Sequence, residues 1–419
     1  MQTLIIGGGL IGLATAQVLV ERGENVRVLE AREGVGLETS FANAGMLTPS
    51  LPEPWNGPGV HRHLASSLFR NSHSMQIRLR MLPSMARWGI SFLRNSTAKR
   101  FFAAVTDNYQ LARYSRGKTL AFIERLGARY ELLDTGTLCV FRSRGHMTHR
   151  RDICNFLARL GMICSEVDAD EIGTIEPALN DVSDKLAGAI WLPGDAIGDA
   201  HLFCRELASE IESGGGEVDT GMQVAGLVVR NGRLTGVDTN RGRIDADRVV
   251  VAAGVSSPEI LRRVGVAMPV KPAKGYSLTF DCAGTTGLPG VAILDQESHA
   301  VITPFTDRIR IVGSAEFAGF DKSIASARTD HLFGVLESLL PALAAKVDRQ
   351  AATPWAGLRP MSNDGRPIIG ATGIDGLFVS GGHGALGWTM AMGSAHLLAD
   401  QLLGAAPDID HRPFLPCRD

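Results

Sequence analysis

The sequence predicts an α/β protein with two parts: a discontinuous domain built on a parallel sheet, and a second α+β domain built on a mainly antiparallel sheet. Three observations support this prediction. A strand–glycine loop–helix–strand pattern occupies the first thirty residues, a buried strand ending in small residues returns near residue 250, and alternating patterns recur between residues 265 and 348. The length of 419 residues also exceeds what one hydrophobic core usually supports.

Composition excludes several classes of protein. Apolar residues make up 45% and charged residues 21% of the chain, so it can bury enough surface to offset its ordering entropy and is not expected to be disordered. With 42 basic and 44 acidic residues, it lacks the basic excess of a nucleic-acid binder. The 48 glycines follow no collagen-like period and indicate turns and close backbone approaches.

Cysteine spacing and hydropathy indicate the compartment. The six cysteines lie at least ten positions apart, which excludes CxxC redox and zinc-ribbon spacings, and no metal site is predicted. The sequence has no secretory signal and no uninterrupted apolar run of the about 18–20 residues that a membrane span needs. We therefore expect a cytoplasmic protein that is soluble or at most rests on a membrane surface.

The first thirty residues match a dinucleotide-binding fingerprint. An apolar strand over residues 2–6 runs directly into Gly-Gly-Gly-Leu-Ile-Gly, and a helical pattern follows at residues 13–22. A second strand at residues 26–29 ends in the acidic residue Glu30. Strand, GxGxxG, helix, strand and acid in this register predict a Rossmann-like domain that binds an adenine dinucleotide, either FAD or NAD.

Each part of the fingerprint has a physical role. Gly7 permits the tight turn, Gly9 lets the backbone approach a pyrophosphate, and Gly12 lets the helix pack closely on the strand. The N-terminus of the helix offers free N–H groups and a positive dipole to phosphates. Glu30 is placed to accept hydrogen bonds from a ribose diol, which disfavours a 2′-phosphate.

The rest of the chain favours FAD over NAD. A regular βαβαβ domain does not follow; instead the chain becomes irregular at residues 38–46 and carries four prolines between positions 49 and 58. Residues 245–254 then form a pattern typical of a buried parallel strand whose small end a cofactor can approach. A cofactor domain that returns after a long insertion is typical of FAD enzymes.

Several further motifs occur in a fixed order along the chain. They are Glu38-Thr39-Ser40, Asn43-Ala44-Gly45, Pro54-Trp55, Thr135-Gly136-Thr137-Leu138, Leu192-Pro193-Gly194-Asp195, Lys274-Gly275-Tyr276-Ser277-Leu278-Thr279, Gly357-Leu358-Arg359-Pro360-Met361, and Gly382-His383-Gly384-Ala385-Leu386-Gly387-Trp388-Thr389-Met390. With these motifs the chain resembles, over nearly its whole length, the D-amino acid oxidase superfamily of FAD enzymes. Within it, the chain is most similar to the bacterial D-amino acid dehydrogenase small-subunit type, and relatives acting on hydroxyproline or glycine share most of the motifs.

The resemblance implies an FAD-binding domain and a set of residues that hold the cofactor. They are Gly7, Gly9, Leu10, Ile11, Gly12, Glu30, Ala31, Arg32, Glu38, Thr39, Ser40, Asn43, Ala44, Gly45, Met46, Val224, Ala252, Ala253, Gly254, Gly357, Arg359, Gly384, Ala385, Leu386, Gly387, Trp388 and Thr389. Some amine-oxidising relatives attach the flavin through a cysteine near the position of Arg359. Because no cysteine lies between Cys282 and Cys417, we expect noncovalent FAD.

Three residues are expected to carry the chemistry. The pattern alone places Arg359 in a turn before Pro360, where arginine is commonly solvated or ion-paired, and the resemblance implies instead that it forks onto the substrate carboxylate. Tyr276 lies in an alternating strand, either as a core-facing aromatic or, as in the family, with its hydroxyl on the same carboxylate. His383 is expected to place the backbone, with catalysis as the alternative.

Two other features complete the expected site. The second GxGxxG, at residues 382–387, precedes a helix at about 389–403 whose N-terminus would stabilise the negative charge of a reduced flavin. Arg308 and Arg310 alternate on a strand and are interpreted first as a solvated strand face, with substrate contact as the alternative.

The resemblance implies oxidative deamination of D-amino acids to 2-oxo acids and ammonia. A hydride passes from Cα to flavin N5, water hydrolyses the imino acid, and the electrons go to a quinone or another acceptor. Two alternatives stay open. One is an oxygen-using oxidase of glycine, sarcosine or hydroxy-D-proline, and the other is the flavin subunit of a heteromeric amino acid dehydrogenase that needs partner subunits.

Two further predictions concern a basic segment and the domain boundaries. No acidic residue lies between Pro54 and Thr106, whereas apolar residues at loosely helical spacing alternate there with Arg62, Arg70, Arg78, Arg80, Arg87, Arg94, Lys99 and Arg100. This basic arm predicts peripheral contact with anionic lipid, or alternatively a face turned to water or to the protein's own acidic surface. We expect residues 1–52, 190–262 and 350–419 to bind FAD, and residues 53–189 and 263–349 to form the substrate-binding domain with the arm.

Overall fold

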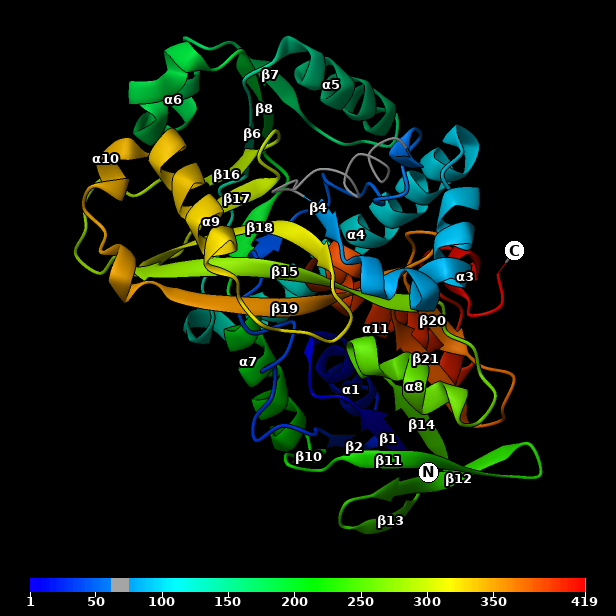
Figure 1. Ribbon diagram of the computed structural model, residues 1–419. Coiled ribbons are helices and arrows are strands. Elements are labelled where there is room, and N and C mark those ends of the chain that lie inside the picture. Colours follow the sequence, from blue (N-terminus) through cyan, green and yellow to red (C-terminus); the bar gives the residue numbers. More distant parts are fainter. Residues whose placement is uncertain (62–74, 419) are drawn as a thin grey trace.

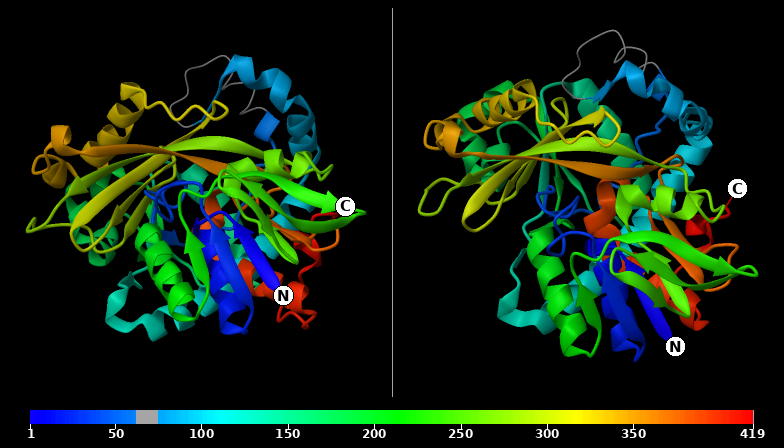
Figure 2. Two further views of the ribbon diagram at one scale, coloured as in Figure 1. Left: turned by 90° about the horizontal axis from the view of Figure 1, so that it is seen from below. Right: turned by 60° about the horizontal axis from the view of Figure 1, so that its bottom comes forward.

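The computed structural model describes residues 1–61 and 75–418 and contains two main sheets (Figure 1). The larger sheet crosses the molecule as a layer, with the parallel sheet and its helices on one side and α9 on the other (Figure 2). The predicted α/β class, with one parallel and one mainly antiparallel sheet, is confirmed. No helix in the described part of the chain is long and apolar enough to cross a bilayer.

The parallel sheet has six strands, of which only the last runs antiparallel to its neighbour. In spatial order they are β10 (Glu217–Asp219), β2 (Asn25–Leu29), β1 (Gln2–Ile6), β14 (Arg248–Val251), β21 (Leu377–Gly381) and β20 (Ile368–Ala371). The central strands are buried apolar runs, as expected for strands covered on both faces. The helices that share a core with this sheet are α1 (Leu10–Glu21), α4 (Ala98–Leu126), α7 (Ala200–Ser213) and α11 (Gly387–Leu403).

The larger sheet has nine strands. Along its main path they are β19 (Thr353–Ser362), β15 (Val270–Asp281), β18 (Arg308–Phe317), β17 (Ala300–Pro304), β16 (Ala292–Asp295), β6 (Thr137–Phe141), β8 (Gly188–Leu192) and β7 (Ser165–Val167), and β4 (Met75–Ile77) pairs with β18. Helix α9 (Ser326–Leu339) packs on one face of β15 and β18, in a core that contains Tyr276, Leu332 and Leu336. The opposite face, which includes Val301 and Val312, is turned toward the parallel-sheet part.

The remaining elements surround these two sheets. They are β3 (Met46–Leu47), β5 (Leu132–Leu133), β9 (Ala196–Gly198), β11 (Val224–Arg230), β12 (Arg233–Thr239), β13 (Gly242–Asp245), α3 (Leu82–Arg94), α5 (Arg144–Ala158), α6 (Ile172–Ile175), α8 (Ser257–Arg262) and α10 (Pro341–Ala344). Strands β11 and β12 form a hairpin at Asn231 and Gly232, both with positive φ, as an Asn-Gly turn requires.

One local prediction was wrong. Arg359 lies inside β19 and not in a turn. Pro360 is compatible with a strand here because β19 is the edge strand of the larger sheet, where one side of the backbone needs no ladder partner. β19 therefore belongs to the larger sheet although it falls within the range 350–419 assigned above to FAD binding; the domain boundaries themselves stay a prediction.

Candidate functional site

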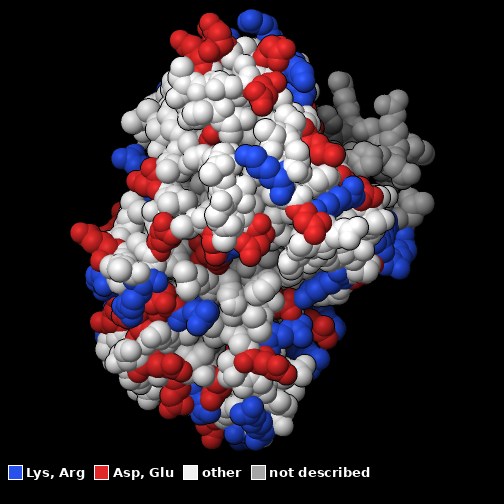
Figure 3. All heavy atoms as spheres, turned by 90° about the vertical axis from the view of Figure 1, so that its left-hand side faces the viewer, with Lys and Arg blue, Asp and Glu red and all other residues white. Residues whose placement is uncertain are grey.

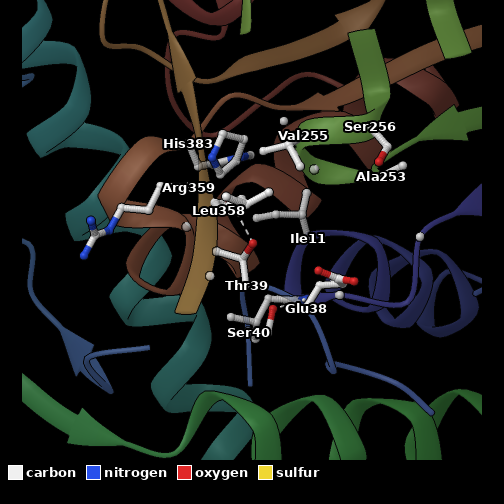
Figure 4. Close-up of a pocket in the computed structure, with 18 of the residues that line it drawn as sticks. Ile11, Glu38, Thr39, Ser40, Ala253, Val255, Ser256, Leu358, Arg359 and His383 are labelled. Atoms are coloured by element: carbon white, nitrogen blue, oxygen red, sulfur yellow. Dashed lines mark hydrogen bonds between the residues drawn. The ribbon is translucent and has the colours of Figure 1, made fainter. Parts of the chain in front are cut away.

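A cavity of about 790 Å³ lies between the two sheets and is lined by segments that are far apart in the sequence. The predicted residues in its wall are Gly7, Gly9, Leu10, Ile11, Glu30, Ala31, Arg32, Glu38, Thr39, Ser40, Asn43, Ala44, Val224, Ala252, Ala253, Gly254, Tyr276, Gly357, Arg359, His383, Gly384, Ala385, Gly387 and Trp388. Figure 4 shows Glu38, Thr39 and Ser40 on one side of the pocket and His383, Val255 and Ser256 on the other, and the Thr39 hydroxyl donates to the Leu358 carbonyl oxygen at 2.7 Å.

At one end, the loop after β1 has the backbone geometry predicted for phosphate binding and is called the phosphate cradle below. Gly7 has φ +114, and a Cβ there would lie 2.6 Å from the carbonyl oxygen of Ala252. Gly9 is the N-cap of α1 in extended conformation, and neither a side-chain cap nor a first-turn acid occupies this end of the helix. The N-terminal end of α1 is therefore suited to an anionic group such as a pyrophosphate.

Glu30 is fixed beside this cradle. Its carboxylate accepts hydrogen bonds from the backbone N–H of Gly8 at 2.6 Å and of Arg32 at 2.7 Å. The side chain is half-buried in the cavity wall, so its remaining lone pairs can accept from a ribose diol. On the opposite side of the cradle, Ser40 accepts from the Leu10 N–H at 3.2 Å and connects the irregular 38–46 loop to α1.

The N-terminal end of α11 forms another wall of the cavity. His383, Ser380 and Trp388 line it, and each has one buried polar atom without a hydrogen-bond partner in the described part of the chain: Nδ1, Oγ and Nε1, respectively. Buried polar atoms are rarely left unpaired in proteins. Three such atoms around one cavity fit a ring system rich in nitrogen and oxygen, such as a flavin.

His383 is uncharged at neutral pH. Burial lowers the pKa of its imidazole to about 3, and Nε2 lies 2.9 Å from the Ser394 hydroxyl. A neutral histidine beside a helix N-terminus avoids two like charges at one place. Its placement agrees with a positioning role, which stays a prediction.

Arg359 is a partly buried cation in the wall of the cavity. Burial lowers the pKa of its guanidinium to about 10, and no carboxylate pairs with it among the described residues. Its contacts are the carbonyl oxygen of Ser314, 3.2 Å from Nη1, and the ring of Trp55, whose centroid is 5.8 Å from Cζ. In Figure 4 the side chain extends to the other side of the β19 ribbon from Ile11 and Ser256.

Tyr276 is not brought together with Arg359. Arg359 pairs across the sheet with Ala273, and Tyr276 lies three positions further on, so the two side chains leave opposite faces of the sheet. The Tyr276 hydroxyl donates to Glu316, and Arg328 of α9 lies 6.0 Å from its ring. A contact between this hydroxyl and a substrate stays a prediction.

Five predicted cofactor residues do not line the cavity. They are Gly12, Gly45, Met46, Leu386 and Thr389. Gly12 lets α1 approach the loop, since a Cβ there would lie 1.9 Å from the Gly7 carbonyl oxygen. The Thr389 hydroxyl accepts from the Thr48 N–H at 3.0 Å and connects α11 to the segment that follows the 38–46 loop.

The interpretation of Arg310 as a solvated residue was wrong. Its exposed fraction is 5%, and Nη1 donates to the Asn43 carbonyl oxygen at 3.0 Å. Arg308 is partly exposed and ion-pairs with Asp199 and Asp307. The alternation of side chains along β18 carries no information about which loop covers this face. The burial of Arg310 follows from its tertiary contact with the 38–46 loop.

Sequence reasoning missed part of the cavity wall. Leu294, Val301 and Val312 contribute apolar surface, and Trp355 lies over Gly357, where a Cβ would come within 2.0 Å of its ring. Phe320 and Lys322 line the cavity from the loop after β18, and Lys322 ion-pairs with Glu38. Of these residues, only Trp355 could have been found from the sequence, because this large aromatic residue lies two positions before the Gly357-Leu358-Arg359-Pro360-Met361 motif.

Comparisons with known proteins agree with this geometry. The chain is 38% identical to the D-amino acid dehydrogenase of Methylobacterium nodulans over 100% of this chain and 99% of that protein. It is 37% identical to the D-amino acid dehydrogenase of Granulibacter bethesdensis over 98% of each. Among solved structures, glycine oxidase from Bacillus cereus superposes with a TM-score of 0.76 at 23% identity, covering 100% of this chain and 99% of that one.

The fold is also shared with L-proline dehydrogenase from P. horikoshii, with a TM-score of 0.78 at 17% identity over 99% of this chain and 96% of that one. A family model described as FAD dependent oxidoreductase matches residues 2–401. With the phosphate cradle, Glu30 and the unpaired polar atoms around the cavity in place, the chain belongs to the FAD dependent oxidoreductase family.

Proposed function

We propose that this protein is an FAD-dependent D-amino acid dehydrogenase, which converts D-amino acids to 2-oxo acids and ammonia. The observation that carries the proposal is the Arg359 guanidinium in the wall of the cofactor cavity, which pairs with no carboxylate among the described residues. A partly buried cation with no acidic partner in the described part of the chain is costly unless a ligand supplies the opposite charge. Curated relatives of nearly equal length bear the name D-amino acid dehydrogenase, which supports the choice of substrate class.

The chain's own residues bind and orient the substrate. Arg359 offers parallel N–H groups to a carboxylate, and this fork fixes both the position and the orientation of the amino acid. Leu294, Val301 and Val312 provide an apolar wall that excludes water and favours an uncharged amine. FAD, when bound by the cradle and the α11 end, supplies the acceptor for the hydride from the substrate Cα.

No acid–base residue is assigned to the reaction. His383 is neutral at ordinary pH, and the Tyr276 hydroxyl is bonded to Glu316 on the far face of the sheet. Once the carboxylate is held and the amine is neutral, orientation accounts for the chemical step. The N-terminus of α11 faces the cavity and would stabilise negative charge that develops there.

Anaerobic reduction of the bound flavin tests this proposal. Single D-amino acids and their L enantiomers are added to purified protein without oxygen, with glycine and hydroxy-D-proline included. Bleaching of the visible flavin band by several D-amino acids and by none of the L enantiomers is expected. Bleaching by glycine or hydroxy-D-proline alone would favour the amine oxidase alternative, and no bleaching with flavin bound would favour a missing partner subunit. Admission of air then shows whether oxygen restores the colour.

A second part of the proposal concerns the electron acceptor. We propose that α3 rests on an anionic lipid surface, from which a quinone reaches the cavity. Its exposed face carries Leu82, Ile90 and Leu93, with exposed fractions of 41%, 54% and 44%. Four neighbouring basic residues are exposed and pair with no acid in the described ranges: Arg87, Arg94, Lys99 and Arg100.

The position of α3 supports this acceptor route. Met81, at the start of α3, lies against Gly319, and the next residue, Phe320, is 62% exposed and lines the cavity. Apolar surface therefore continues from α3 toward the cavity. By contrast, Arg78 ion-pairs with Glu316 and Asp321, so this part of the arm meets the protein's own acidic groups. Arg62 and Arg70 lie outside the described residues.

Charge reversal tests the lipid contact. The triple variant Arg87→Glu, Arg94→Glu, Lys99→Glu is expected to lose binding to anionic liposomes while it keeps its activity with a soluble dye. The matched control reverses Arg230, Arg233 and Arg243 on the hairpin sheet, which are also exposed. The face shown in Figure 3 mixes basic and acidic side chains, so the charge on that face should not bind anionic lipid. Equal liposome binding by both triple variants would contradict the proposal.

A further inference from the structure

The Arg359 side chain crosses a neighbouring strand before it reaches its hydrogen-bond partner. It starts on β19, passes over β15 and ends on the Ser314 carbonyl of β18. The crossing point is Gly275: a Cβ there would lie 2.5 Å from Cζ, Nη1 and Nη2 alike, whereas ordinary contact begins near 3.4 Å. Any side chain at position 275 would therefore occupy the space of the guanidinium.

The partner strand is distorted at the same rung. Lys274 pairs with Glu316 and Tyr276 pairs with Gly313, so Gly275 alone faces Ser314 and Ala315, which defines a β-bulge in β18. Ser314 is buried with φ +60, a left-handed conformation that residues other than glycine seldom adopt. Such strain persists where the surrounding structure enforces it and often accompanies function.

Both distortions affect the position of the Arg359 side chain. In a regular ladder the carbonyl of residue 314 would lie in the plane of the sheet and bond to a neighbouring strand. Here it accepts from Arg359 Nη1 at 3.2 Å on the face where the guanidinium lies. The glycine supplies the space and the bulge supplies the acceptor, and both act on the same side chain.

We infer that Gly275 and the Ser314 bulge are positioning residues that hold the Arg359 guanidinium for carboxylate recognition. This inference rests on the proposed function, because it assumes that Arg359 binds the substrate carboxylate. It assigns a role to two residues that need not touch the substrate. A displacement of about 1 Å in such a group can cost about 100-fold in rate.

The test measures binding without turnover. Pyruvate carries the carboxylate of the expected product and no amine, and its dissociation constant is obtained from the perturbation of the bound-flavin spectrum. Gly275→Ala and Ser314→Val are each expected to weaken pyruvate binding at least tenfold. Glycine adopts φ +60 freely, so Ser314→Gly is expected to keep the affinity for pyruvate within about threefold of the wild-type value. Pyruvamide, which lacks the carboxylate, should bind equally to all of these proteins.

Matched substitutions control for strand damage and strain. Gly226→Ala places a methyl group in open space on β11, and Asn231→Val strains an exposed turn residue with φ 52. Neither is expected to change pyruvate affinity. A double-mutant cycle gives the decisive result: if Gly275 acts through Arg359, Gly275→Ala should weaken binding no further in an Arg359→Ala background.

Two results would overturn the inference while leaving the proposed role of Arg359 intact. Gly275→Ala and Ser314→Val that bind pyruvate as well as the wild type would show that neither residue positions Arg359. Additive losses in the Arg359→Ala background would show that they act elsewhere. Should Gly275→Ala fail to retain flavin, Ser314→Val and its Ser314→Gly counterpart decide by themselves. A wild-type protein that binds no pyruvate would instead refute the proposed role of Arg359, and this inference with it.

Discussion

The two faces of the larger sheet near Gly275 differ in how their charged side chains are paired. On the cavity face, Arg359 has no acidic partner in the described structure. On the α9 face, Glu316 pairs with Arg78 at 2.5 Å and with the fully buried Lys274 at 3.3 Å, and accepts from Tyr276. On the proposed function, this difference distinguishes a charge that binds a ligand from charges that stabilise the fold.

The carboxyl groups show the same contrast. Burial by itself raises the pKa of Glu316, but hydrogen bonds from Tyr276 and Arg78 and the charge of Lys274 bring it below its ordinary value. Asp195 is buried with only hydroxyl and amide donors, and burial raises its pKa to about 6. A buried carboxyl thus stays ionised where cations surround it and takes up a proton more readily where they do not.

The largest expected effect is on the cavity face. Arg359→Ala should lower kcat/KM for D-amino acids about 1,000-fold, equivalent to about 4 kcal/mol, because the carboxylate loses its fork. The free energy of unfolding should fall little, since no protein carboxylate is left unpaired. Steady-state kinetics and chemical unfolding measure the two quantities. A kcat/KM within tenfold of the wild type would remove Arg359 from substrate binding.

A substitution in the ion-paired cluster on the α9 face should lower stability and leave substrate binding nearly unchanged. Glu316→Gln leaves the buried Lys274 without its full counter-charge and should cost about 3 kcal/mol of folding free energy. The KM of the folded variant should stay within about threefold of the wild type. The double variant Lys274→Met, Glu316→Gln removes both charges and should recover much of the loss. A large rise in KM at unchanged stability would contradict this assignment.

Asp195 should make stability depend on pH. Its folded-state pKa of about 6 lies above the unfolded value near 3.9, so the folded protein binds the proton more tightly. The stabilisation is fully present below about pH 4 and is lost as pH rises through 6. Relative to Asp195→Asn, the wild type should lose up to about 3 kcal/mol between pH 4 and pH 7. If the free energy of unfolding depended on pH in the same way for the wild type and Asp195→Asn, the raised pKa of Asp195 would be contradicted.

Tyr276→Phe should have the smallest effect. Loss of the hydroxyl removes one donor to Glu316 and should cost about 1–2 kcal/mol of stability. The KM for D-amino acids should change less than threefold, because the hydroxyl lies on the α9 face. A tenfold rise in KM would place it on the substrate carboxylate instead, as the resemblance to the D-amino acid oxidase superfamily implied.

Much of the fold and the cofactor half of the site could be predicted from the sequence. The strand at residues 2–6 has the predicted bounds, and the helix expected at about 389–403 is α11 (Gly387–Leu403), because hydrophobic periodicity is a local signal. The glycines of the fingerprint, Glu30 and the start of α11 likewise follow from short motifs. Each of these motifs works through its own backbone, so its position in the chain almost determines its position in space.

The substrate half depended on tertiary structure. Arg359 was expected in a turn and lies in β19, and Arg310 was expected in water and is buried under the 38–46 loop. Which face Tyr276 takes follows from its register with β18 and β19, and the Ser314 bulge appears only when those strands pair. The sequence by itself determined which groups could do the chemistry; strand pairing decided which side each group faces, since one step along a strand reverses a side chain's direction.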